Sequence, residues 1–348
     1  MLRKFGFFTR MTGAVLTGLT VATLLLPLSA QAADPPIKAP AVAEAPAASA
    51  QAAPAAASVP HNAAATWRDA RGGIAGVTTV RGTETGVLIS AQGNTWRAIR
   101  NGLITPYGGA LLLTVAGLIL LFYKKSGTIK LHTPKTGRSM ERFTLNERRA
   151  HWLVAISFVC LALSGIILLF GKHIFLWLLG HDLFSWLGWL SKNLHIAAGF
   201  IFVFGVAILF KIFWRDNLWD KSDAEWIRKG GGLATKEHVP SRRFNFGEKV
   251  WFWLGLSFFG LIMIVSGLVL TFPNLFDTRA AMQYAEIVHA ISACLVIAMS
   301  LGHIYMGTVG MEGAFDAMKT GKVDEAWAKE HHEIWYQEEL AKRNGGGS

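Results

Sequence analysis

The chain has 348 residues, of which 52% are hydrophobic and 16% are charged, and its formal net charge is +11. Several apolar runs are close to the about 20 residues that a helix needs to cross a bilayer, which excludes an ordinary soluble protein and predicts an integral membrane protein. The basic excess indicates no nucleic-acid partner, because the lysines and arginines gather in loops between the apolar runs. Cys160 and Cys294 lie inside such runs, where we expect small core residues rather than a disulfide.

Residues 1–32 have the pattern of a secretory signal peptide. A basic start is followed by an apolar stretch and by an A-x-A cleavage motif at Ala30–Ala32. An uncleaved first helix is the alternative, since the apolar stretch is long for a signal peptide. Residues 33–104 begin as an Ala/Pro-rich linker, which is too poor in bulky side chains to order itself, and continue as an extracytoplasmic segment with "VLIS" as a possible short strand.

Five apolar runs predict five membrane-spanning helices, since backbone polar groups in lipid must be satisfied within the segment. The runs are Pro106–Tyr123, Trp152–Gly171, Leu194–Trp214, Val250–Phe272 and Ile287–Met311. The sequence thus predicts an all-α membrane protein with an extra helix at 105–123, a cytoplasmic loop at 124–149, a four-helix bundle at 150–311 and a cytoplasmic tail at 312–348.

The basic residues predict how the helices are oriented. The loops at 124–149 and 215–249 each hold eight lysines or arginines, whereas the loop at 172–192 holds two and that at 273–286 holds one. The positive-inside rule places the first two loops in the cytoplasm and the other two outside. The mature N-terminus then lies outside, in agreement with a cleaved signal peptide, and the tail lies inside. We expect a multi-pass protein of the bacterial inner membrane.

Four of the eleven histidines fall inside or at the ends of the predicted helices, namely His151, His195, His289 and His303. Polar side chains at membrane depth are costly and usually functional. Fourteen residues separate His289 from His303, which is about 21 Å along a helix and about 40° short of four turns, so both share one face. Because successive helices alternate in direction, His195 lies at the outer level of His289, and His151 lies at the inner level of His303.

Two histidine pairs stacked across a bilayer fit two b-type haems, because haem iron takes one imidazole on each face. The outer haem would be held by His195/His289 and the inner haem by His151/His303. Structural zinc would need four ligands in one cluster, whereas these histidines come two per level. A proton pathway would need Asp or Glu in the cores of the last four helices, and these cores have none. Glycines in the helices, among them Gly165 and Gly267, permit a close approach of helices or of a macrocycle.

Six stretches also carry a family resemblance. They are "ERRAHW" (147–152), "NLHIAAG" (193–199), "FNFGEKVWFW" (244–253), "IVHAISA" (287–293), "LGHIYMG" (301–307) and "GKVDEAWAKEHHEIWY" (321–336). Together they span about residues 140–340 and resemble the cytochrome b (gamma) subunit of respiratory formate dehydrogenases. An apolar helix with two histidines would also fit the cytochrome b subunits of nickel–iron hydrogenases and other quinone-linked reductases.

The resemblance implies a four-helix haem bundle that is bound to an iron–sulfur beta subunit and to a molybdenum- or tungsten-containing alpha subunit. Formate would be oxidised on the alpha subunit, and electrons would pass through the outer and inner haems to membrane quinone. The family's haem ligands fall on the four histidines, and its quinone pocket falls on His303, Asn245 and Gly247. An asparagine or a backbone N–H can donate to a quinone carbonyl, while a helix cap is the alternative role for Asn245.

Other features leave alternatives open. The shorter members of the family begin near residue 140, so the signal peptide and the extra helix depart from the pattern. In the tail, His331 and His332 favour a solvated helix end over a metal site. A membrane anchor or transporter without redox function, in which the histidines only bond between helices, is a further alternative and predicts a colourless protein.

Overall fold

The computed structural model describes residue 68 and residues 91–232, 239–273 and 279–345. The chain divides into two units, 1–68 and 69–348, and the elements given below all belong to the second. The predicted signal peptide, the Ala/Pro-rich linker and the possible strand "VLIS" lie outside the described residues.

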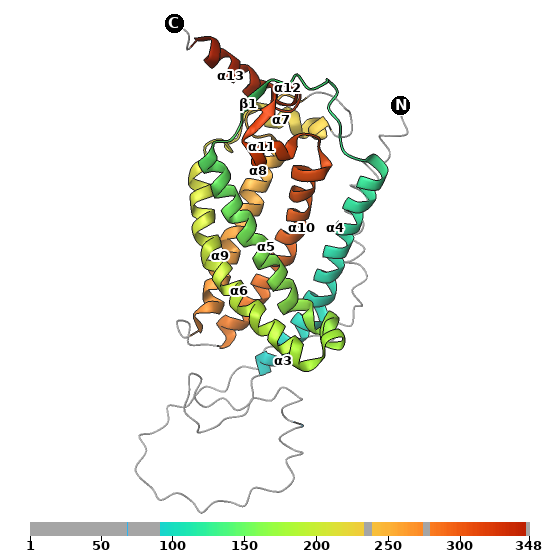
Figure 1. The fold of residues 1–348 in the computed structure, drawn as a ribbon. Helices are drawn as coiled ribbons and strands as arrows, with labels where there is room; N and C mark the ends of the chain where they lie inside the picture. The colour runs from blue at the N-terminus through green and yellow to red at the C-terminus, as the bar shows by residue number, and fades with distance from the viewer. Residues whose placement is uncertain (1–67, 69–90, 233–238, 274–278, 346–348) are drawn as a thin grey trace, which may run out of the picture. The chain divides into compact units, whose positions relative to one another are not determined.

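Five helical segments of the described chain are long and apolar enough to cross a membrane, which confirms the predicted multi-pass helical protein. Figure 1 shows them running alongside one another. The first comprises α3 (Ala91–Ala98), the π-helix η1 (Ile99–Ile104) and α4 (Thr105–Ser126); the second is α5 (Leu145–Ile174); the third is α6 (Leu176–Phe213); the fourth comprises α8 (Phe246–Val250), the π-helix η3 (Trp251–Phe259) and α9 (Gly260–Thr271); the fifth comprises α10 (Arg279–Tyr305) and the π-helix η5 (Met306–Gly310).

The helices are longer than their apolar runs. The expected outer loop at 172–192 is mostly helix, since α6 already begins at Leu176 and is kinked at Gly180, where φ is 73° and ψ is 177°. Charged side chains such as Asp182 interrupt an apolar run without interrupting the backbone hydrogen bonds of a helix. His195 therefore lies well inside α6 rather than at its start.

The segments between and after the long helices form a polar cap at the end of the bundle where α5 begins (Figure 1). The cap contains β1 (Ser139–Glu141), α7 (Lys221–Arg228), the 3-10 turn η2 (Gly230–Gly232), α11 (Ala314–Thr320), β2 (Lys322–Asp324), α12 (Glu325–His331) and α13 (Glu333–Gly345). Strands β1 and β2 pair antiparallel, with the buried Met140 opposite the buried Val323. The sequence predicts only a loop and a tail here, so these strands and short helices were not expected.

Two similar sequence motifs start α5 and α8. The motif "RFTLNE" spans 142–147 and "RFNFGE" spans 243–248. Each motif forms a capping box. The side chain of Thr144 or Asn245 accepts a hydrogen bond from the backbone N–H of the glutamate three residues later. The carboxylate of that glutamate accepts a hydrogen bond from the backbone N–H of the cap residue. Both helices therefore begin in the same way, 101 residues apart.

The two motifs also bind each other reciprocally. Arg142 of the first contacts Glu248 of the second at 2.9 Å, and Arg243 of the second contacts Glu147 of the first at 2.8 Å. Each arginine also donates to the other's backbone carbonyl oxygen, at 2.8 and 2.7 Å. We call these contacts the arginine cross-brace. It fixes the start of α5 against the start of α8.

The repetition continues into the helices. "LSGIILLF" (163–170) lies in α5, and "VSGLVLTF" (265–272) covers the end of α9. The two motifs are now 102 residues apart rather than 101. The π-helix η3 lies between them in the second copy, and a π-helical segment accommodates one extra residue. Since α5 packs along α6 and α9 along α10, the bundle consists of two similar helical pairs.

His332 does not lie at a solvated helix end, so that expectation was wrong. Its side chain is 1% exposed, and its Nδ1 donates to the carbonyl oxygen of Arg242 at 2.7 Å. Burial and the neighbouring charge of Arg142 lower the pKa of His332 to about 3. The residue is therefore a neutral internal part of the cap. Its neighbours Trp327 and Trp335 are buried with it.

The buried His332 predicts an acid-sensitive cap. Its folded pKa lies below the unfolded value of about 6.5, so its contribution is complete above that pH and is lost as the pH falls toward 3. His332→Asn keeps a donor for Arg242 and cannot be protonated, so its melting temperature should fall less than that of the wild type between pH 7 and pH 4. Thermal unfolding in detergent measures this. His181→Asn, at an exposed histidine, should follow the wild type. Equal slopes for His332→Asn and wild type would contradict the prediction.

Candidate functional site

The four predicted histidines meet in two pairs. The ring centroids of His195 and His289 are 6.1 Å apart, and those of His151 and His303 are 6.4 Å apart. These are the two pairs expected from the sequence. His289 and His303 both lie on the unbroken helix α10, fourteen residues or about 21 Å apart, so the pairs occupy two levels of the bundle. We call His151/His303, near the cap, the proximal pair and His195/His289 the distal pair.

The separations fit two imidazoles on one metal ion. A metal–imidazole bond is about 2 Å long, so rings on opposite faces of an ion have centroids about 6 Å apart. Within the described ranges, no three His, Cys, Asp or Glu side chains come together as a possible metal site. Two imidazoles suit a haem iron, whose macrocycle fills the other positions, and do not complete a tetrahedral zinc site.

Two serines bind the distal pair. Ser164 Oγ lies 2.9 Å from His195 Nδ1, and Ser266 Oγ lies 2.8 Å from His289 Nδ1. Each hydroxyl also donates to a carbonyl oxygen one turn earlier, on Cys160 or Ile262, at 2.6 Å. Its hydrogen is thus used, so the oxygen accepts a bond from Nδ1–H. Both distal histidines are therefore protonated on Nδ1 and keep the Nε2 lone pair for a ligand bond.

The glycine after each serine leaves room for the same ring. A Cβ at Gly165 would lie 3.3 Å from Cε1 of His195, and a Cβ at Gly267 would lie 3.4 Å from Cε1 of His289. The close approach expected for these two glycines is thus an approach of helix to histidine. The repeated Ser-Gly pair of α5 and α9 seats both distal rings.

The proximal pair is held differently. Nδ1 of His151 is buried and has no hydrogen-bond partner among the described residues. The ring of His303 stacks on Trp251, with centroids 4.8 Å apart and planes 12° apart. Glu248 is close enough to His303 to interact with it electrostatically. Packing and charge, rather than serine hydroxyls, surround these two rings.

The residues expected for quinone lie at the start of α8. Asn245 Oδ1 accepts from the backbone N–H of Glu248 at 3.0 Å, so Asn245 has the cap role that was its alternative. A Cβ at Gly247 would lie 3.3 Å from the ring of Trp226. In the described part of the chain no direct contact joins either residue to His303. The link is through Trp251, one turn after Gly247, which stacks on that histidine.

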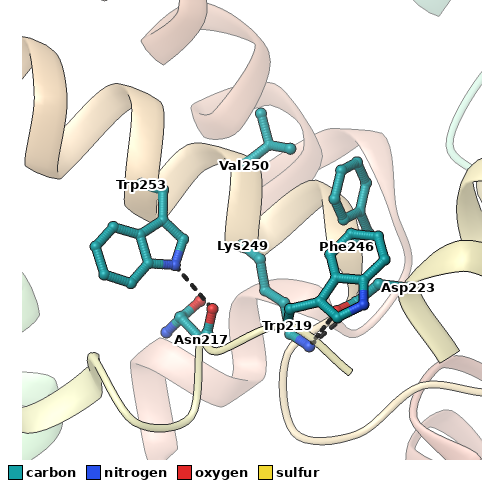
Figure 2. A pocket seen from close by; sticks show the side chains of 7 residues that line it. All are labelled: Asn217, Trp219, Asp223, Phe246, Lys249, Val250 and Trp253. Atoms are coloured by element: carbon teal, nitrogen blue, oxygen red, sulfur yellow. Dashed lines mark hydrogen bonds and ion pairs between the residues drawn. The ribbon is translucent and has the colours of Figure 1, made fainter. Parts of the chain in front are cut away.

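A surface hollow lies on another face of the same helix (Figure 2). Its lining includes Phe246, Lys249 and Trp253, which share one side of α8 and η3, whereas Gly247 and Trp251 lie on a different side. Lys249 and Asp223 form a buried ion pair of 2.8 Å in its wall, so their charges are already matched. The hollow is separate from the histidine pairs.

Ser164, Ser266 and Trp251 are part of the site but were not expected from the sequence. The repetition of Ser-Gly in "LSGIILLF" and "VSGLVLTF", each in a predicted helix, is the signal that would have pointed to the serines. The stacking of Trp251 on His303 depends on the π-helix η3, and that helix has no comparable sequence signature.

The chain is similar to several known proteins. Residues 142–321 match the family described as prokaryotic cytochrome b561. The cytochrome b556(fdo) subunit of formate dehydrogenase from Escherichia coli strain K12 is 31% identical over 206 residues, which are 57% of this chain and 92% of that protein. The nitrate-inducible cytochrome b556(Fdn) subunit of the same strain is 29% identical over 55% and 88% of the two chains. The formate dehydrogenase cytochrome b556 subunit of Haemophilus influenzae is 28% identical over 56% and 82%.

The matched region contains both histidine pairs, the arginine cross-brace and the two Ser-Gly motifs. It leaves out residues 1–141, which include the first helix and the predicted signal peptide, the two features expected to depart from the family pattern. The chain therefore belongs to the prokaryotic cytochrome b561 family and is a multi-pass membrane cytochrome b with an electron-transfer role.

Proposed function

We propose that the chain is the cytochrome b subunit of a membrane formate dehydrogenase and carries electrons from an iron–sulfur subunit through two haems b to membrane quinone. The observation that carries the proposal is the pair of imidazole separations near 6 Å at two levels of one bundle. The choice of formate is supported by the relatives, which are named as formate dehydrogenase subunits.

The proposed ligands are His195 and His289 for the outer haem and His151 and His303 for the inner haem. Haem iron supplies reversible one-electron chemistry when it is bound. The chain's contribution is to hold two imidazoles at each level, and the arginine cross-brace fixes the start of α5, the helix that carries His151.

The proposed quinone pocket lies beside the inner haem and uses His303, Asn245 and Gly247. Asn245 accepts with its oxygen when it caps α8, so its amide N–H₂ group remains as a donor. The backbone N–H of Gly247 lies in the first turn of that helix, where N–H groups have no partner within the helix. The amide of Asn245 and the backbone N–H of Gly247 are thus two donors at the same end of the bundle as the imidazole of His303.

The proposed orientation places the polar cap in the cytoplasm, because most basic residues between the helices gather there. Quinone would then react near the cytoplasmic side. The distal pair would face the outer side, where the iron–sulfur beta subunit and the molybdenum- or tungsten-containing alpha subunit would bind. The extra helix α4 packs against α10 and contributes no histidine to either pair.

The haem assignment predicts two haems b per chain in the wild type. His195→Ala should retain only the inner haem, and His303→Ala should retain only the outer haem, since each loses one axial ligand. Pyridine haemochrome assays with reduced-minus-oxidised spectra count the haems. The exposed His173 lies outside both pairs, so His173→Ala should keep two. A folded wild-type chain without haem would exclude the assignment and favour the anchor or transporter alternative.

The quinone assignment predicts a selective effect of Asn245→Ser. Serine caps a helix about as well as asparagine but has no amide N–H₂ group. The KM for quinone should rise about 3- to 10-fold, which corresponds to one hydrogen bond, while both haems stay bound. Thr144→Ser, at the equivalent cap of α5, is the matched control and should not change the KM. An unchanged KM in Asn245→Ser would remove this residue from the pocket.

The choice of electron donor predicts which substrate reduces the haems. In the purified native complex, formate should reduce both haems, and hydrogen gas should reduce neither. Optical spectra recorded after anaerobic addition of each substrate test this. Reduction by hydrogen but not by formate would instead assign the chain to a hydrogenase, the main alternative from the sequence.

A further inference from the structure

We propose that Ser164 and Ser266 are positioning residues of the outer haem, which fix the tautomer of its two ligands and keep its potential below that of the inner haem. This inference rests on the proposed function. It concerns two side chains that the family resemblance and the comparisons leave without a role.

The contacts define the role of each serine. Each hydroxyl donates to a carbonyl oxygen of its own helix and accepts from a histidine of the facing helix, so it links a fixed backbone to a ring. Ser164 is 2% exposed and Ser266 is 5% exposed, so water does not compete for these bonds. Each ring is held with Nδ1 protonated and with Nε2 available for the iron.

The hydrogen bond also changes the ligand electronically. An imidazole that donates from Nδ1 becomes a more basic ligand through Nε2, which stabilises the oxidised, more highly charged state of the iron. Both outer ligands have such an acceptor. At the inner level Nδ1 of His151 has no partner in the described part of the chain, and His303 stacks on an indole. The charge of the nearby Glu248 is offset by its ion pair with Arg142 at 2.9 Å. The outer haem should therefore have the lower potential, which favours electron transfer toward the inner haem.

The ordinary alternative is that these serines only bond back to their own helix, as serines in apolar helices often do. Ser157 does this in the same helix α5. It is 4% exposed, donates to the carbonyl oxygen of Leu153 at 2.8 Å, and has no contact with a histidine among the described residues. Ser157 therefore matches Ser164 in helix, burial and back-bonding, and differs only in the histidine contact.

The experiment is a redox titration of the native complex, followed at the haem absorption bands, for wild type, Ser164→Ala, Ser266→Ala, the double variant and Ser157→Ala. The outer haem is identified as the one that His195→Ala loses. We expect its midpoint potential to rise in each single variant and further in the double variant, while the inner haem stays unchanged. Ser157→Ala should leave both potentials at their wild-type values.

An outer potential that stays at the wild-type value in both single variants would overturn the inference, as would equal shifts of both haems. If an alanine variant does not retain the outer haem, threonine and valine at the same position decide. Threonine keeps the hydroxyl and valine has nearly the same shape, so recovery of the haem with threonine alone supports the inference. Recovery with both overturns it. A wild type without haem would instead refute the proposed function, so the two failures are distinguishable.

Discussion

Two imidazole rings about 6 Å apart in an apolar bundle are the feature on which the rest of this structure depends. In the distal pair both Nδ1 atoms donate to serine, so both Nε2 atoms are acceptors, and no donor among the described residues reaches them. Two ring nitrogens with free lone pairs at this separation suit a metal ion held between them. The geometry of the distal pair therefore fits an iron between the rings better than a direct contact of one ring with the other.

The fold holds these rings through two similar helical pairs. The motifs at 142–147 and 243–248 start the first helix of each pair, and their arginines and glutamates are exchanged across the cross-brace. Repeated Ser-Gly motifs further along each helix seat one distal histidine each. The two copies diverge at the proximal level, where the π-helix η3 brings Trp251 onto His303. The sequence similarity of the two helical pairs thus explains the matching serine contacts of the distal pair. Their difference at η3 explains the tryptophan contact of the proximal pair.

The histidine pairing was predictable because it depends on quantities that a sequence contains. Helical rise and twist place His289 and His303 on one face at two levels, and alternating helix direction assigns their partners. Helix ends were less predictable, because charged residues end an apolar run before they end a helix. The cap was missed for another reason. Arg142 and Glu248 are far apart in the chain, and no local pattern reveals that they meet.

His332 in the tail and Asn245 at the start of α8 are two further residues whose surroundings could not be predicted from the sequence. His332 was expected in solvent because it lies in the predicted cytoplasmic tail, yet tryptophans of α12 and α13 bury it in the cap. Asn245 fits a helix cap and a quinone donor equally well by residue type, and its capping bond leaves the N–H₂ group for the second role. Residue type gave the candidates in both cases. The three-dimensional neighbours place His332 in the cap and show Asn245 capping α8, while the quinone role of Asn245 stays a prediction.

We propose that two bis-histidine haem sites are stacked within this one chain. Near-infrared magnetic circular dichroism of the oxidised wild-type protein, with the haem content determined on the same sample, tests it most directly. The oxidised protein should show the charge-transfer band of bis-imidazole ligation, with an intensity that corresponds to two low-spin haems per chain. A single haem, or a band typical of histidine–methionine ligation at either site, would contradict it.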